Sequence, residues 1–176
     1  MREPNTASSG EDNPSIGAMI LAAGLSRRMG GTDKTFALLS GKPLVLHSLE
    51  VFQACSFISR TVLVLAGPNL DKGRRLIDKR GYKERVSICL GGPHRQDSAR
   101  CGLALLEGCE WVVVHDGARP CLDLDTLNRG ISNALEHGNA VAAVPVVDTI
   151  KVADDEGHVV RTPPRQELWA AQTPQI

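Results

Sequence analysis

The sequence has no net charge, no long apolar run and no paired cysteine motif, and each absence excludes a class of protein. Twenty Lys and Arg residues balance twenty Asp and Glu residues, so no overall positive field favours nucleic acid, and any phosphate site must be built locally. No apolar run approaches the roughly 20 residues of a membrane-spanning helix. Met1 to Ser15 lacks the apolar core of a secretion signal. The sequence therefore predicts a soluble cytoplasmic protein with neither nucleic acid nor membrane as partner.

The five cysteines are odd in number and have no C-x-x-C spacing. Three of them lie in apolar segments, where cysteine acts as a small hydrophobic residue. We therefore expect reduced thiols, without a zinc site or a disulfide framework.

Residues 1–14 are polar and lack periodic apolar positions, which is typical of a disordered leader. The globular domain is expected to span residues 15–176, and no internal repeat is visible. Within it, short β-branched runs predict buried parallel strands at Ile16–Leu21, Arg60–Ala66, Arg85–Cys89, Trp111–Val114 and Ala140–Val147.

Helical patterns separate these runs. Their apolar positions are Val45, Leu49 and Phe52; Ala99, Leu103 and Leu106; and Leu124, Leu127, Ile131 and Leu135. Asp123 and Gly138 are placed to begin and end the last helix, so the D-x-D sequence at Asp123 is interpreted as a helix cap. This alternation predicts an α/β fold with a doubly wound, mostly parallel sheet that binds ligands beyond the carboxyl ends of its strands.

One segment, residues 148–165, departs from this alternation. Two extended pieces, Thr149–Ala153 and His158–Arg161, flank the turn sequence Asp-Asp-Glu-Gly. The segment has too little apolar surface to form core, and we expect it to project from the sheet as a β-hairpin arm.

The strongest local signal is the run from Leu21 to Gly30, Leu-Ala-Ala-Gly-Leu-Ser-Arg-Arg-Met-Gly, followed by Lys34. Small residues after a buried strand let main-chain N–H groups approach a ligand, and the basic side chains neutralise its charge. The run matches neither the P-loop nor the G-x-G-x-x-G pattern. It therefore indicates a different kind of polyphosphate site.

This run resembles the signature loop shared by sugar-phosphate nucleotidylyltransferases and molybdenum-cofactor guanylyltransferases. Three further motifs follow it, the Gly91–Ser98 loop, Val114-His-Asp-Gly-Ala-Arg-Pro120 and Asp148-Thr-Ile-Lys151, and the chain closes with Gln172-Thr-Pro-Gln175. Their order and spacing resemble the 2-C-methyl-D-erythritol 4-phosphate cytidylyltransferase family from Ala18 to Ile176. The resemblance implies a Rossmann-like, three-layer fold and transfer of CMP from CTP to the polyol phosphate, with release of pyrophosphate.

The resemblance also implies roles for individual residues. Arg28 and Lys34 match the catalytic basic pair that contacts the nucleotide phosphates. Preorganised cations suit this reaction, because attack of one phosphate on another builds negative charge. Asp116 follows a strand and is the carboxylate best placed for Mg²⁺ or the ribose. The expected nucleotide-binding residues are Ala22, Ala23, Gly24, Gly91, Gly92, Ser98 and Asp116.

For the second substrate, the matching residues are Arg119, Thr149, Lys151, Arg165 and Thr173. In the family the arm reaches across a twofold axis, so the resemblance implies a homodimer through residues 148–165. His115, beside Asp116, is not expected to share a metal with it, because neighbouring residues at a strand end point in opposite directions.

Three features depart from the family pattern. Pro93 occupies a position that is often acidic in the family, and it has no N–H to donate. Asp33-Lys34-Thr35 replaces the usual Pro-Lys-Gln around the catalytic lysine. The resemblance also implies that about a quarter of the family length, including a second phosphate-binding lysine, would follow Ile176. Two alternatives therefore stay open: a ribitol 5-phosphate cytidylyltransferase and a nucleotide-binding fragment without catalysis.

Overall fold

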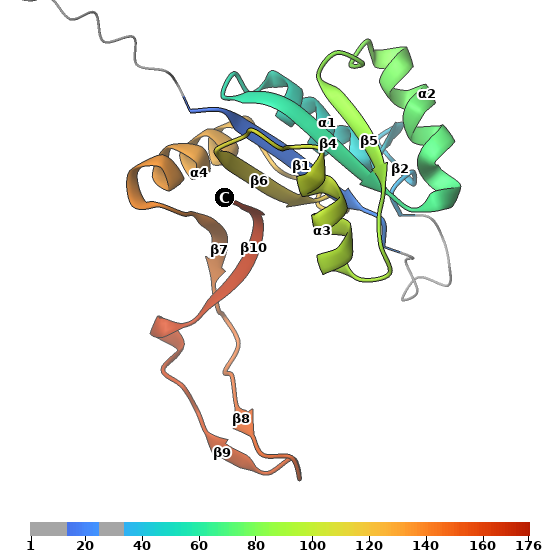
Figure 1. The fold of residues 1–176 in the computed structure, drawn as a ribbon. Coiled ribbons are helices and arrows are strands. Elements are labelled where there is room, and N and C mark those ends of the chain that lie inside the picture. Colours follow the sequence, from blue (N-terminus) through green and yellow to red (C-terminus); the bar gives the residue numbers. More distant parts are fainter. Residues whose placement is uncertain (1–13, 25–33) are drawn as a thin grey trace, which may run out of the picture.

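The computed structural model describes residues 14–24 and 34–176. Most of the expected leader and the predicted catalytic Arg28 lie outside the described residues. The main sheet of the described part has six strands in the order β5-β4-β1-β6-β10-β7 (Figure 1). Four of them pair in parallel, namely β1 (Ile16–Ala22), β4 (Ile58–Leu65), β5 (Val86–Leu90) and β6 (Trp111–Asp116). The predicted α/β class with a mostly parallel sheet is confirmed.

Alternation along β1 sends side chains to two different cores. Ala18 and Ile20 pack with α1 (Leu44–Ala54), with Ile77 of α2 (Leu70–Arg80) and with α4 (Leu124–His137). Met19 and Leu21 pack on the opposite face with Leu106, beside α3 (Arg95–Ala104). Because successive residues of a strand point to opposite faces, one short apolar run supplies both cores. The result is the predicted three-layer arrangement.

The helix ends predicted for α4 are also observed. The Asp123 carboxylate accepts a hydrogen bond of 2.6 Å from the N–H of Thr126, and this bond lowers the pKa of Asp123. Gly138 caps the other end. On α3, however, the predicted apolar face is wrong at Leu103, which is 48% exposed, because the buried side of this short helix is formed by Ser98 and Gly102. Leu135 likewise lies at the edge of its helix, at 36% exposure.

The far edge of the sheet differs most from the sequence-based expectation. The segment expected to form a buried strand at Ala140–Val147 forms β7 (Val141–Pro145), in which Val141 is 51% and Val144 is 52% exposed. β7 pairs with β10 (Trp169–Gln175), which runs antiparallel between β6 and β7. The predicted strand is present and runs in the same direction as β6, but the prediction that it is buried was wrong and it has no parallel neighbour, because an unforeseen strand, β10, separates it from the parallel core.

The arm between β7 and β10 is a hairpin that extends away from the sheet (Figure 1). Its strands are β8 (Val152–Ala153) and β9 (Val159–Arg161). The Asp154 carboxylate accepts hydrogen bonds from the N–H groups of Glu156 and His158, and Gly157 has a φ of 87°. This is the turn chemistry expected from Asp-Asp-Glu-Gly, with strands shorter than expected.

The smaller elements are β2 (Leu38–Leu39) and β3 (Lys42–Pro43), which form a separate hairpin, and the single-turn helices η2 (Gly67–Asn69) and η3 (Arg165–Glu167). Within residues 14–24 and 34–176, none of the helices combines the length and apolar character needed to span a bilayer.

Candidate active site

The predicted nucleotide-binding residues meet where the parallel strands end. Because β1, β5 and β6 point the same way, Ala22, Gly91 and Asp116 lie along one edge of the sheet. A Cβ added at Gly91 would lie 2.3 Å from the Cβ of Ala23, and one added at Gly117 would lie 2.9 Å from the Cβ of Ala22. Two glycine-containing loops therefore pack directly against the small residues that end β1.

Ser98 fixes the loop that follows β5. Its side chain is 4% exposed, and its hydroxyl accepts a hydrogen bond of 3.2 Å from the N–H of Gly92. A Cβ added at Gly91 would also lie 2.8 Å from this hydroxyl oxygen, and one at Gly92 would lie 2.3 Å from the Cβ of Asp97. The loop thus lies tightly against α3, which a larger side chain would prevent.

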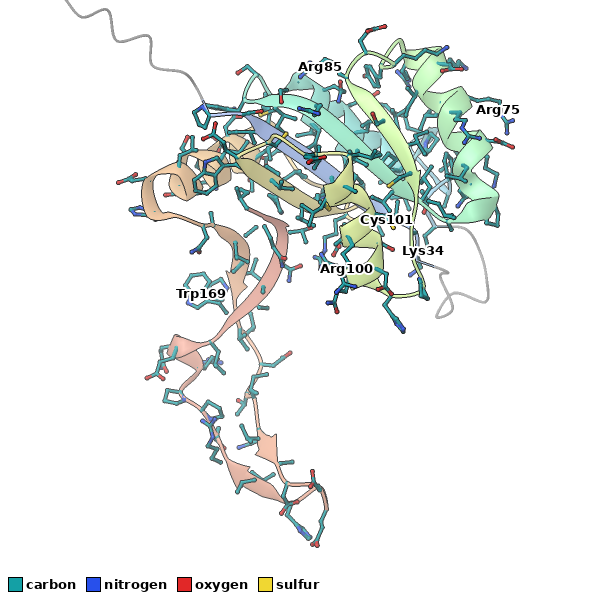
Figure 2. The ribbon with its side chains drawn as sticks, in the orientation of Figure 1. Lys34, Arg75, Arg85, Arg100, Cys101 and Trp169 are labelled. Atoms are coloured by element: carbon teal, nitrogen blue, oxygen red, sulfur yellow. The ribbon has the colours of Figure 1, made fainter. Side chains whose placement is uncertain are left out.

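Lys34 is tied to the same edge through its neighbour. The Thr35 hydroxyl is 3.2 Å from the main-chain oxygen of Ala22, and the Thr35 side chain is buried. Thr35 also accepts a backbone hydrogen bond from Val45, at the start of α1. The threonine that departs from the family pattern therefore connects the lysine's turn to the end of β1. Figure 2 shows Lys34 well apart from Trp169, which lies at the root of the arm.

Asp116 is held between two arginines. Its Oδ1 accepts from Nε and Nη2 of Arg95 at 3.2 and 3.0 Å, and its Oδ2 accepts from Nε of Arg119 at 3.3 Å. The Arg119 guanidinium also donates to Oε1 of Gln172, on β10. These contacts bring α3, β6 and β10 together around one carboxylate, whose side chain is 32% exposed.

Beneath this ion cluster lies a buried polar layer. His115 is 1% exposed, and its Nε2 is 3.1 Å from the main-chain oxygen of Arg119. Its Nδ1 is 3.0 Å from the hydroxyl of Thr173, which also accepts a hydrogen bond of 3.2 Å from the N–H of Asp116. As expected, His115 and Asp116 point in opposite directions, and the histidine ring lies against Phe52 of α1. Burial lowers the pKa of His115 below its ordinary value.

This burial predicts a pH-dependent stability. Because the folded state holds His115 below its ordinary pKa of 6.5, the unfolded chain binds a proton first as the pH falls. The free energy of unfolding should therefore decrease below pH 6.5 and level off below the folded-state pKa, with a slope of at most about 1.4 kcal/mol per pH unit. Urea unfolding of the wild type and of His115→Gln at several pH values measures this slope. An equal slope in both proteins would contradict the assignment.

The arm residues are not brought to this edge within one chain. The Lys151 ammonium donates to the Thr162 hydroxyl at 2.8 Å, and the Arg165 guanidinium donates to the main-chain oxygen of Val147 at 2.9 Å. Thr149 precedes β8 in the same arm. Figure 1 shows this arm extending away from the ends of β1 and β5. Of the predicted second-substrate residues, only Arg119 and Thr173 lie beside Asp116.

Several residues at this site were not assigned roles from the sequence. Arg95 is part of the Gly91–Ser98 motif and Gln172 is part of the Gln172-Thr-Pro-Gln175 motif, but the sequence predicted no role for either side chain. The sequence does not show that Arg95 contacts Asp116 or that Gln172 contacts Arg119. Both contacts depend on where α3 and β10 lie in three dimensions. Gly117 could have been recognised from the sequence, because a glycine directly after a strand indicates a close approach of main chains.

The donor set for a metal is small. In the described part of the chain, no group of three or more His, Cys, Asp or Glu side chains is arranged to hold a metal ion. One partly exposed carboxylate, Asp116, faces the site, and one or two carboxylates suffice for Mg²⁺ that is bound mainly by substrate phosphates. The residues present therefore fit a metal that arrives with a triphosphate.

Comparison with known proteins assigns the family. The model of the 2-C-methyl-D-erythritol 4-phosphate cytidylyltransferase family matches residues 16–176. The enzyme of that name from Dehalococcoides mccartyi strain CBDB1 is 47% identical over 164 residues, which cover 93% of this chain and 72% of the relative. The enzyme from Alkaliphilus metalliredigens is 40% identical, over 92% of this chain and 68% of the relative.

Solved structures agree with the sequence comparison. The crystal structure of 4-diphosphocytidyl-2C-methyl-D-erythritol synthase from Anaerococcus prevotii superposes with a TM-score of 0.82 at 29% identity, covering 93% of this chain and 70% of that one. The 2-C-methyl-D-erythritol 4-phosphate cytidylyltransferase from Thermus thermophilus gives 0.65 at 28% identity, over 92% and 69% of the two chains. With its fold, its motifs and these relatives in agreement, the chain belongs to the 2-C-methyl-D-erythritol 4-phosphate cytidylyltransferase family.

Proposed function

We propose that this protein transfers CMP from CTP to 2-C-methyl-D-erythritol 4-phosphate and releases pyrophosphate, a step in isoprenoid synthesis. The observation that carries the proposal is the meeting of three loops at one sheet edge, with Gly91 against Ala23 and Gly117 against Ala22. Glycine and alanine leave main-chain groups accessible to a nucleotide, and Asp116 and Arg119 stand beside them. We expect the enzyme to work in the cytoplasm, where CTP is made.

In the proposed reaction, a phosphate oxygen of the polyol phosphate attacks the α-phosphorus of CTP. The new P–O bond forms as the bond to the β-phosphate oxygen breaks, and pyrophosphate leaves. Lys34, together with Arg28, neutralises the charge that builds on the phosphates, so that no covalent enzyme intermediate is needed. Asp116 is the carboxylate that would hold Mg²⁺ or the ribose, and a bound Mg²⁺ would supply further charge neutralisation at the phosphates.

The base is recognised by the loop after β5. Main-chain groups of Gly91 and Gly92 face the nucleotide in this proposal, and the buried Ser98 hydroxyl holds the loop in place through Gly92. The cytosine amine is a donor, so its recognition falls to carbonyl acceptors and to Ser98, whereas Pro93 has no N–H to offer to the acceptor atoms of the base. Preference for CTP over UTP in a competition binding measurement tests this assignment, and equal affinities would contradict it.

Arg95 joins the base-binding loop to Asp116, and we expect it to matter for the nucleotide. Replacing it with alanine removes the two guanidinium contacts to Oδ1 of Asp116 and should raise KM for CTP about tenfold. Arg100→Ala is the matched control, because Arg100 is an exposed arginine on the same helix (Figure 2). Steady-state kinetics with CTP as the varied substrate distinguish the two variants. Equal KM values would remove Arg95 from the site.

The polyol phosphate is expected to lie near Arg119, with Thr173 closing the same region. Thr149, Lys151 and Arg165 belong to the arm, which extends away from this chain's own site, so we propose that they complete the site of a second copy in a homodimer. Exposed apolar side chains support an interface at the arm and its root: Val147 is 81%, Trp169 is 61% and Val160 is 65% exposed. Burying such surface is favourable.

The dimer makes a separate prediction. Val147→Asp should shift the sedimentation coefficient toward that of a monomer, because a carboxylate would be buried in the interface without a partner. Leu38→Asp is the control, since Leu38 is 71% exposed but lies on β2, away from the arm. A wild-type monomer in sedimentation velocity would contradict the proposed dimer.

Pyrophosphate release tests the proposed function directly. The protein is incubated with CTP, Mg²⁺ and either 2-C-methyl-D-erythritol 4-phosphate or ribitol 5-phosphate. Release with the first substrate alone is the expected result. Release with ribitol 5-phosphate instead would identify the alternative enzyme, and saturable CTP binding without release would identify a nucleotide-binding protein.

A further inference from the structure

Three buried polar side chains lie directly beneath Asp116 and Arg119, and each comes from a different element. His115 of β6 is 1% exposed, Ser48 of α1 is 0% exposed, and Thr173 of β10 is 9% exposed. None of these groups is assigned a chemical step in the transfer reaction. Buried polar groups cost stability unless they are satisfied, so such a layer needs a reason in the fold or the function.

The contacts favour one arrangement of the protons. The main-chain oxygen of Arg119 can only accept, and it is 3.1 Å from Nε2 of His115 and 3.1 Å from the hydroxyl of Ser48. The Ser48 hydroxyl donates to this carbonyl, so its oxygen, 3.3 Å from Nε2, is left as an acceptor toward the ring. Both contacts favour a hydrogen on Nε2. In a neutral imidazole this leaves Nδ1 as an acceptor, and the Thr173 hydroxyl, 3.0 Å away, donates to it.

The same Thr173 hydroxyl accepts the N–H of Asp116 at 3.2 Å. A continuous chain of hydrogen bonds thus runs from the Asp116 N–H through Thr173 to His115 and ends on the Arg119 carbonyl. Both of its ends are main-chain groups of the residues that carry the carboxylate and the guanidinium of the site. The chain also joins β6 to β10, from which Gln172 contacts Arg119.

We propose that His115 is a positioning residue for CMP transfer: its ring, hydrogen-bonded at both Nε2 and Nδ1, fixes the main chain at Asp116 and Arg119 so that their side chains meet the substrates. This inference rests on the proposed function. It also gives the Thr173 hydroxyl a task inside the protein, in addition to closing the second-substrate region. A shift of about 1 Å in such groups can lower a rate about a hundredfold, which is why a buried layer can matter to chemistry it does not touch.

The competing explanation is that the ring only fills space. Its centroid lies 5.6 Å from that of Phe52, which is itself fully buried. Packing and hydrogen bonding can be separated by substitution. His115→Phe keeps an aromatic ring beside Phe52 and removes both hydrogen bonds. His115→Gln loses the ring but places an amide donor near the position of Nε2. Phe52→Leu disturbs the ring contact and leaves the hydrogen bonds in place.

We expect His115→Phe to bind CTP about tenfold more weakly and to turn over about 30- to 100-fold more slowly than the wild type. His115→Gln should recover both quantities to within about fivefold. Phe52→Leu should lower the melting temperature by about 3–8 °C while keeping kcat and CTP affinity within about threefold. Thr173→Val removes the hydroxyl and should also weaken CTP binding. Thr173→Ser keeps the hydroxyl and should retain the CTP affinity of the wild type.

Two results would overturn the proposal. In the first, kcat and CTP affinity change across the variants only in proportion to the melting temperature, and His115→Phe and His115→Gln have the same values. Long-range ¹H–¹⁵N spectra that place the ring proton on Nδ1 would overturn it as well. Failure of the proposed function looks different. A wild type that binds CTP but transfers nothing to the polyol phosphate refutes that function, and the CTP affinities of the variants still decide the role of His115. A wild type that does not bind CTP refutes both.

Discussion

Lys34→Ala is expected to lower kcat for CMP transfer by at least about 10²- to 10³-fold while leaving the fold intact. The lysine begins a turn, residues 34–36, that Thr35 ties to the end of β1, so its ammonium is delivered to the edge where the triphosphate is proposed to bind. Loss of one preorganised charge next to a developing anion has effects of this size. Turnover is measured by pyrophosphate release, and the fold by circular dichroism and thermal unfolding.

Lys79→Ala is the matched control for the loss of one positive charge. Lys79 is exposed on α2, so this variant should keep wild-type turnover. Lys34→Arg keeps the charge but changes its geometry and should recover only part of the lost activity. If Lys34→Ala turned over within threefold of the wild type, the phosphate site would have been placed wrongly.

Gly91→Ala is expected to disrupt the nucleotide site by overpacking. Its new Cβ would lie 2.3 Å from the Cβ of Ala23 and 2.8 Å from the Ser98 hydroxyl oxygen. The loops after β1 and β5 must then separate, which should lower the free energy of unfolding by about 1–3 kcal/mol and weaken CTP binding more than tenfold. Urea unfolding and calorimetric titration with CTP measure the two effects.

Gly67→Ala is the control for this substitution. A Cβ at Gly67 would meet only Leu90 Cδ1, at 3.8 Å, which is an ordinary van der Waals contact. That variant should keep both stability and CTP affinity. Unchanged CTP binding in Gly91→Ala would show that the two loops do not act as a unit.

The parallel half of the fold could be predicted from the sequence because its local signals agree. β-branched runs mark β4, β5 and β6, and each observed boundary lies within two residues of the expected one. β10 could not be found in this way. Its sequence, Trp169 to Gln175, contains two glutamines and a proline and buries little, so it lacks the apolar alternation that reveals a strand. Its place between β6 and β7 is set by long-range pairing.

In the candidate site, too, some features could be predicted from local sequence and others depend on long-range contacts. Ala22, Gly91 and Asp116 could be grouped in advance, because parallel strands end at a common edge. The pairing of Arg95 and Arg119 with Asp116 could not be predicted, because Arg95 begins α3 and Arg119 follows β6, and their meeting depends on three-dimensional placement. The resemblance to a family named Thr173, but only the structure shows its hydroxyl bonded to both His115 and Asp116. Arg28 remains a prediction, since it lies outside the described residues.

The position of β10 has a consequence for the order in which the chain can fold. β10 lies between β6 and β7 but follows both of them in sequence, with the whole arm in between. During synthesis, β1, β4, β5 and β6 can pair as soon as they emerge, whereas β7 has no partner until residues 169–175 arrive. The nascent intermediate would thus carry an unpaired strand, and the Asp116 N–H would lack its Thr173 partner. Loop closure over the arm would be a late and comparatively slow event, and the contacts of Thr173 and Gln172 with Asp116 and Arg119 would form at that event, after the parallel core.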